Sequence, residues 1–191
     1  MTALVLGLVL FLGAHSVRVF AEDWRRGVIA RRGEKAYKGV YTLLSIAGIV
    51  LIVWGFGQAR QNPVMLWPPQ TWARHLALLL VPVSFVFIAA AYVPRNHIKA
   101  RLHHPMVLGV KLWAFAHLLA NNMLHEVVFF GAFLAWAVLS FRAARARDRA
   151  AGTVYAPGTA KGTVIAVLAG VVFSAVFALW LHQPVAGVRP Y

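Results

Sequence analysis

Long apolar runs alternate with short basic segments along the chain. A membrane-spanning helix needs about 20 mostly apolar residues, and the first apolar run, 2–20, has that length. Three later runs have it too: 39–57, 75–93 and 163–183. The pattern predicts a transmembrane helix over each of these ranges, with a kink at Pro82 in the third.

Residues 105–141 predict a further pair of helices. The range is long enough for two helices of about 27 Å each, just enough to cross a membrane. We expect the turn near Asn121–Met123, because Asn ends helices by tolerating left-handed backbone angles; a re-entrant pair is the alternative. The sequence thus predicts an all-α, polytopic membrane bundle of six transmembrane helices, forming a single domain over residues 1–191.

Composition agrees with a membrane protein. The chain is 61% hydrophobic, with a mean hydropathy of +0.70, whereas soluble domains are about 45–50% apolar. It contains no cysteine, which excludes disulfides, zinc–thiolate sites and iron–sulfur clusters. The charges of the first apolar run follow it, opposite to the order in a cleaved signal peptide, so we interpret this run as a retained span.

The net charge of +14 is concentrated in segments between the apolar runs. Lys and Arg number seven in 18–38, three in 94–104 and five in 142–162. The opposite side has only Arg60, Arg74 and Arg189. By the positive-inside rule, both termini face away from the cytoplasm. This pattern is typical of loops beside anionic lipid, so the expected partner is a lipid bilayer and not nucleic acid.

Ionisable residues inside spans are candidates for function because they are costly to bury there. Four places qualify: His15, Lys111, His117 and the pair His125–Glu126. For His15 the alternative is a structural bond to a carbonyl of a neighbouring helix, because buried imidazole needs partners. Lys111 has the alternative of extending its ammonium group to the headgroups.

His117 lies within the segment WAFAHLLANNMLHE, residues 113–126. A tight turn centred near residue 122 would place His117 opposite Glu126. A carboxylate there could accept the ring proton, as carboxylates do for ligating histidines; the alternative is a plain hydrogen bond that closes a hairpin. His103 and His104 directly precede Pro105, a typical helix start.

Two intramembrane histidines on different helices are the arrangement of a bis-histidine haem b site, because haem iron accepts neutral imidazole. Histidines on separate helices are common, however, so this pattern has little specificity by itself. Without cysteine, covalent haem attachment through a C-x-x-C-H motif is excluded.

Two motifs carry a resemblance to a known family. The segments LGAHSVRV and HHPMVLGVKLWAFAHLLANN resemble the NnrU family of membrane proteins over nearly the whole chain. The resemblance implies a helical bundle in the bacterial inner membrane and an association with denitrification and nitric oxide metabolism. In that membrane, the distribution of Lys and Arg places both termini in the periplasm. The family includes a plant fifteen-cis-zeta-carotene isomerase, which implies haem b held by His15 and His117, and a small-molecule or carotenoid-like ligand. That enzyme has a cysteine at the position of Ala114, so an exchange of ligand there is not available to this chain.

Four alternatives stay open. In straight, upright helices His15 and His117 differ in depth by about 12 Å, which makes His104 the alternative ligand beside His15. Arg18 or Arg101 can pair with a haem propionate. The run from His103 to Met106 also resembles small membrane methyltransferases of the isoprenylcysteine type, although their Arg and Tyr are missing. The last alternative is a non-enzymatic accessory protein whose histidines only join helices.

Overall fold

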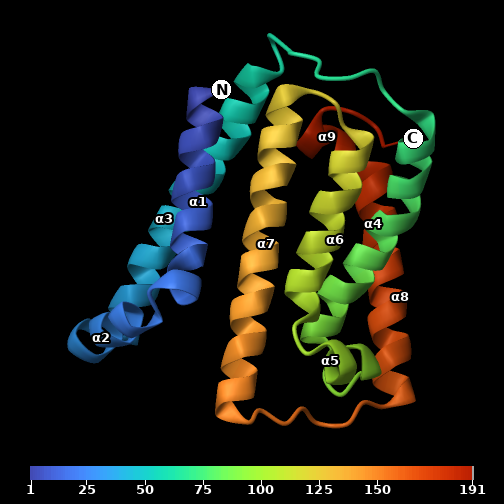
Figure 1. Ribbon diagram of the computed structural model, residues 1–191. Coiled ribbons are helices and arrows are strands. Elements are labelled where there is room, and N and C mark those ends of the chain that lie inside the picture. Colours follow the sequence, from blue (N-terminus) through green and yellow to red (C-terminus); the bar gives the residue numbers. More distant parts are fainter. Residues whose placement is uncertain (191) are drawn as a thin grey trace. The chain divides into compact units, whose positions relative to one another are not determined.

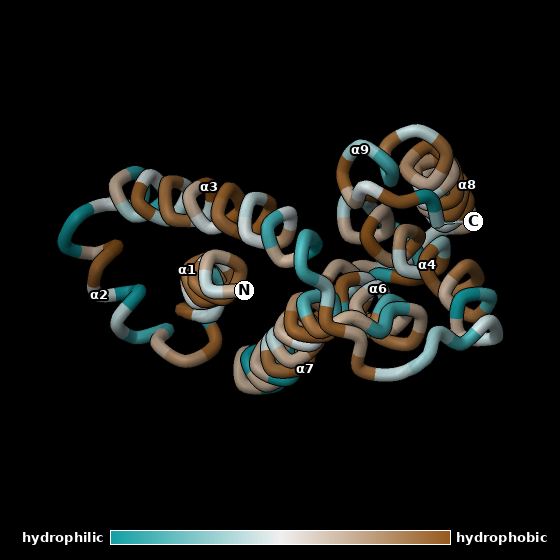
Figure 2. Tube along the Cα trace, turned by 90° about the horizontal axis from the view of Figure 1, so that it is seen from above, coloured by the Kyte–Doolittle hydropathy of each residue, from teal (hydrophilic) through white to brown (hydrophobic). Residues whose placement is uncertain are grey.

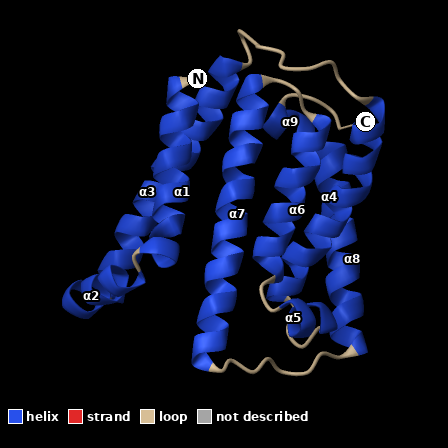
Figure 3. Cartoon of the chain, viewed as in Figure 1, coloured by secondary structure: helices blue, strands red, loops and turns tan. Residues whose placement is uncertain are grey.

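Helices account for the architecture of this protein. The computed structural model describes residues 1–190, and these form helices joined by loops, with no β-strand among them (Figure 3). The predicted all-α membrane fold is therefore confirmed. In chain order the elements are α1 Thr2–Phe20, α2 Glu22–Arg32, α3 Glu34–Ala59, α4 Thr71–Tyr92, α5 His97–Leu102, α6 Pro105–Ala120, α7 Leu124–Ala151, α8 Ala160–Val176, a π-helical turn Phe177–Leu181, and α9 His182–Ala186 (Figure 1).

Five helical stretches are long and apolar enough to cross a membrane: α1, α3, α4, α7 and the continuous stretch from Ala160 to Ala186. The sixth apolar helix, α6, has 16 residues. At 1.5 Å per residue it is about 24 Å long, shorter than the hydrocarbon core of a bilayer. The six predicted apolar helices are therefore present, and α6 is the one that falls short of full spanning length.

The predicted boundaries hold to within a few residues, with one error of backbone conformation. α6 begins at Pro105 and α7 begins at Leu124, so the turn lies where the sequence indicated. Asn121, however, is extended, with φ −106° and ψ 144°. The expected left-handed ending is therefore wrong. α4 runs through Pro82 without interruption of the helix.

The basic segment 18–38 is mostly helical, which the sequence pattern did not predict. α2 has no buried residue, so no apolar stripe marks it. Its charges suit a helix instead: Glu22 and Asp23 lie in the first turn, and Arg31 and Arg32 in the last. Acids near the N-terminus and bases near the C-terminus complement the helix dipole.

The described helices form two compact units. Unit 1 consists of residues 1–68 and 122–140, and unit 2 of residues 69–121 and 141–190. The core of unit 1 is made of Leu4, Leu8 and Leu12 of α1 and Ile52 of α3. Side chains of α7 pack against it, among them Phe129, Phe133 and Trp136.

In unit 2, α4 packs against both α6 and α8 (Figure 1).

Helices of both units are also apolar on the surfaces that face away from other helices. Figure 2 shows hydrophobic residues around α3 of unit 1 and along α8 of unit 2. Leu43, Val53, Leu168 and Val172 are more than half exposed in these two helices. Exposed apolar surface of this extent fits lipid rather than water.

Glycines bring α1 and α3 into backbone contact. A Cβ added at Gly7 would lie 2.6 Å from the Ile52 nitrogen, and one at Gly48 would lie 2.9 Å from the Phe11 nitrogen. A Cβ at Gly55 would overlap the Leu4 nitrogen. Small residues at such contacts let membrane helices pack closely, where dispersion forces replace the hydrophobic effect.

The α3–α4 loop is attached to the segment before α7. The Leu66 N–H donates to the Asn122 carbonyl at 2.9 Å, and the Leu124 N–H to the Val64 carbonyl at 2.8 Å. The buried Asn122 amide donates to the Trp67 carbonyl at 2.6 Å. Asn122 therefore does more than form a turn, because its side chain satisfies the backbone of a loop distant in the sequence.

The α1–α3 contact gives a stability prediction. Gly55→Ala should destabilise the protein by about 1–3 kcal/mol, because the new methyl group overlaps the α1 backbone. Gly57→Ala is the matched control on the same helix: nothing lies within 4 Å of its added Cβ, and alanine favours helix by up to about 1 kcal/mol. Thermal unfolding in detergent micelles measures both. Equal midpoints for the two variants would contradict the close contact.

Candidate functional site

His15 is held in a defined orientation by its own helix. Its Nδ1 lies 2.7 Å from the carbonyl oxygen of Phe11, one turn earlier on α1. A carbonyl only accepts, so Nδ1 carries the proton, and Nε2 of the neutral ring is the acceptor. This bond stays within α1, so the alternative of a carbonyl from a neighbouring helix is wrong for Nδ1.

Aromatic rings from three helices surround His15. The His15 ring centroid lies 4.2 Å from that of Phe11, 5.0 Å from that of Tyr41 and 6.1 Å from that of Trp136, which meets it edge-on. The indole Nε1 of Trp136 is buried and has no hydrogen-bond partner within residues 1–190. One turn later on α7, the Ser140 hydroxyl is also buried and has no hydrogen-bond partner within residues 1–190. Unsatisfied buried polar atoms are rare, and each calls for an explanation.

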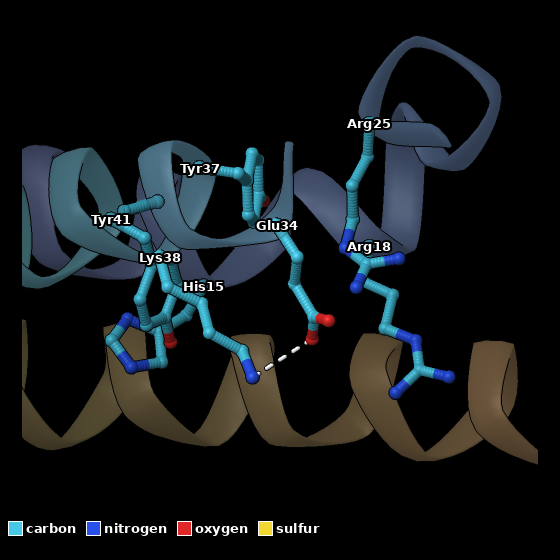
Figure 4. A pocket seen from close by; sticks show the side chains of 8 residues that line it. His15, Arg18, Arg25, Glu34, Tyr37, Lys38 and Tyr41 are labelled. Carbon is cyan, nitrogen blue, oxygen red and sulfur yellow. Dashed lines mark ion pairs between the residues drawn. The ribbon is translucent and has the colours of Figure 1, made fainter. Parts of the chain in front are cut away.

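A hollow of about 250 Å³ opens beside His15, and we refer to it as the His15 hollow (Figure 4). The Lys38 ammonium lies 2.8 Å from the carboxylate of Glu34, one turn earlier on α3. Arg18 lines the same hollow, so the structure brings this predicted residue together with His15. The lining residues are Ala14, His15, Arg18, Arg25, Glu34, Tyr37, Lys38 and Tyr41.

His117, on α6, repeats the orientation of His15. Its Nδ1 lies 2.9 Å from the Trp113 carbonyl, again one turn earlier, and its ring is 5.1 Å from the Trp113 ring. The side chains of Ala114 and Ala116 beside it are fully buried. His15 belongs to unit 1 and His117 to unit 2, so their joint ligation of one haem stays a prediction.

Glu126 has a structural task that the sequence analysis missed. Its Oε2 accepts a hydrogen bond at 3.1 Å from the Met123 N–H, at the start of α7. A carboxylate three residues into a helix that bonds back to the preceding N–H is one half of a capping box. The sequence did contain a signal for this bond, because Glu126 follows Met123 by the three residues typical of a capping box. The predicted contact between Glu126 and His117 would join the two units and stays a prediction.

A second polar cluster, which we call the Asp148 cluster, lies within unit 2. His104 Nε2 is 2.8 Å from Asp148 Oδ2, and the Tyr155 hydroxyl donates to the same oxygen at 2.9 Å. The Nε2 of His104 is thus engaged by a carboxylate. The role of His104 as the alternative haem ligand stays a prediction, and in the structure its ring bonds to Asp148.

His103 extends the Asp148 cluster under backbone strain. Its φ of 68° is in the left-handed region that non-glycine residues rarely adopt. Its ring stacks on Tyr155 at 4.2 Å with 21° between the planes, and its Nδ1 accepts a hydrogen bond from the Arg145 guanidinium. Strain of this kind persists only where surrounding contacts fix the residue.

Burial raises the pKa of Tyr155, and its hydrogen bond to Asp148 and the charge of that carboxylate raise it further. The phenol therefore stays protonated as a donor. Sequence reasoning missed both residues. The available signal was that Asp148 is the one acid in the basic segment 142–162. Among residues 1–190, no group of three or more His, Asp or Glu side chains is placed to hold a metal ion.

The Asp148 cluster predicts a pH-dependent contribution to stability. Tyr155→Phe should lower the free energy of unfolding by about 1 kcal/mol at neutral pH, the usual worth of one hydrogen bond. The contribution is complete below about pH 10, the pKa of an unfolded tyrosine, because the folded pKa is higher. Above it the unfolded chain releases the proton first, so the difference between wild type and variant shrinks as pH rises. Unfolding in detergent micelles from about pH 7 to about pH 11 measures this.

The matched control is Tyr92→Phe, because Tyr92 lies at the end of α4 and is 73% exposed. It should leave stability unchanged across the same pH range. A Tyr155→Phe variant as stable as the wild type at neutral pH would show that the bond to Asp148 contributes nothing.

Comparison with known proteins gives one match. The family model described as NnrU protein matches residues 3–190. No curated protein and no solved structure matches the chain. The match extends over both units and includes the segments around His15 and His117. The chain belongs to the NnrU family.

Proposed function

We propose that this integral membrane protein binds haem b and that His15 would be a ligand of its iron. The observation that carries the proposal is the bond from His15 Nδ1 to the Phe11 carbonyl. Ligating histidines almost always donate their second ring N–H to a carbonyl or carboxylate, which fixes the tautomer and leaves the other nitrogen for the metal. The bond to Phe11 already gives His15 this tautomer, with Nε2 left for the metal.

The surroundings of His15 fit the chemistry of haem b, an apolar macrocycle with two carboxylates. Phe11, Tyr41 and Trp136 supply aromatic surface, and the unsatisfied Trp136 Nε1 supplies a donor without a partner. Arg18 lines the His15 hollow, and a guanidinium group binds propionates by charge-assisted hydrogen bonds. When bound, haem would supply an iron that changes oxidation state.

His117 is the residue we propose as the second ligand. Support comes from its bond to the Trp113 carbonyl, which sets the same tautomer as in His15, and from the family motif in which it lies. Ala114 next to it adds no side-chain donor. In this proposal the two histidines act only as neutral imidazoles that bind and orient the cofactor.

The wider role that we propose is redox, isomerase-like or associated with nitric oxide and denitrification. The protein would act in the bacterial inner membrane with both termini in the periplasm, as the distribution of Lys and Arg indicates. A carotenoid-like or other small apolar ligand would suit the lipid-exposed surface of its helices.

An absorption spectrum tests the proposal. Protein purified in detergent from haem-replete cells should show a Soret band, and its reduced spectrum should shift. His15→Ala should lower the haem content per protein by about tenfold or more, the scale on which altered metal shells lose affinity. His75→Ala is the matched control, because His75 is exposed near the start of α4; it should keep the full haem content.

A colourless wild-type preparation would overturn the proposal, as would equal haem content in the His15→Ala and His75→Ala variants. The alternative function, an accessory protein whose histidines only join helices, predicts that colourless result together with lower thermal stability of a His15→Ala, His117→Ala double variant.

A further inference from the structure

Three arginines line one face of the C-terminal part of α7. Arg142, Arg145 and Arg149 border a shallow, open hollow on the surface of α7 together with Phe141, Ala143 and Ala146, and we call it the arginine hollow. Spacings of three and four residues place the three arginines on the same side of the helix. The apolar part of the α7 span ends where they begin, so the arginine hollow lies at the level of a membrane–water interface.

These arginines lack the carboxylates that other basic residues of the chain have. Arg25 and Arg26 pair with Glu22, and Lys38 pairs with Glu34. Within the described residues 1–190, no ion pair neutralises Arg142, Arg145 or Arg149. Asp148, the nearest acid along α7, is occupied by His104 and Tyr155. The arginine hollow therefore has an uncompensated positive charge.

Arg145 is held in place by a chain of contacts. Its guanidinium donates to His103 Nδ1, the His103 ring stacks on Tyr155, and the Tyr155 hydroxyl is fixed by Asp148. Arg145 is half-buried, whereas Arg142 and Arg149 are exposed. A cation that is partly desolvated and positioned by an imidazole side chain gains from an anion that the chain itself does not provide.

We propose that the arginine hollow binds the phosphate headgroup of an anionic phospholipid. Guanidinium groups match phosphate oxygens with two parallel hydrogen bonds. The position next to Phe141, at the end of an apolar span, favours a phosphate that is part of an amphiphile over free phosphate in water. Basic pockets at the ends of membrane helices are where anionic headgroups bind. The proposal does not depend on haem.

A lipid titration tests the site. The purified protein in uncharged detergent is titrated with dioleoyl phosphatidylglycerol, dioleoyl phosphatidylcholine or inorganic phosphate, and its thermal midpoint gives an apparent affinity. Phosphatidylglycerol should raise the midpoint of the wild type, and the other two should not. The triple variant Arg142→Gln, Arg145→Gln, Arg149→Gln should bind phosphatidylglycerol on the order of 100-fold more weakly.

Two further variants keep the test decisive. Arg142→Gln with Arg149→Gln leaves the contact between Arg145 and His103 intact, and should still weaken binding on the order of tenfold. Arg31→Gln, Arg32→Gln, Lys35→Gln removes the same charge from exposed positions and should bind like the wild type. Equal weakening in both triple variants would overturn the proposal, because bulk charge alone would then explain binding. No shift with phosphatidylglycerol, or an equal shift with inorganic phosphate, would also overturn it.

Discussion

Direct backbone contact between α1 and α3 is the constraint on which the candidate cofactor site depends. Gly7, Gly48 and Gly55 leave no room for a Cβ between the two helices. This distance sets how near the Tyr41 ring of α3 comes to His15 of α1. In lipid no hydrophobic effect drives helices together, so close packing must supply the stability. The glycines therefore decide both the stability of unit 1 and the geometry around its histidine.

The few acids of this chain have distinct tasks. Only five are present against 19 bases. Glu22 and Glu34 neutralise bases around the His15 hollow, Glu126 caps the start of α7, and Asp148 fixes Tyr155 and His104. Since the acids are used in this way, the basic residues left over mark where anions from outside the chain are expected to bind.

The sequence predicts the apolar helices well, because length and hydropathy are local properties. It also placed the α6–α7 turn and the start of α6 at Pro105. It missed α2, whose helix depends on charges rather than an apolar stripe. It assigned Asn121 a left-handed conformation, whereas the segment that follows is extended and bonds the α3–α4 loop.

The candidate site could be predicted only in part for a related reason. His15 was recognisable as a polar residue within an apolar run, and Arg18 follows it one turn later. The Asp148 cluster was not recognisable, because His103 and His104 meet Asp148 and Tyr155 only through tertiary contacts. No periodicity records a contact between residues more than 40 positions apart.

The division of unit 1 along the chain has a consequence for biosynthesis. Its first part, residues 1–68, is translated well before residues 122–140. Phe133 and Trp136, which complete the core around Leu8 and Leu12, leave the ribosome only after α4 and α6 have been made. At about 5–20 residues per second this interval lasts several seconds. During that time the α1–α3 pair must persist in the membrane on the contacts between these two helices, and the surface that later receives α7 is open to lipid and to the insertion machinery.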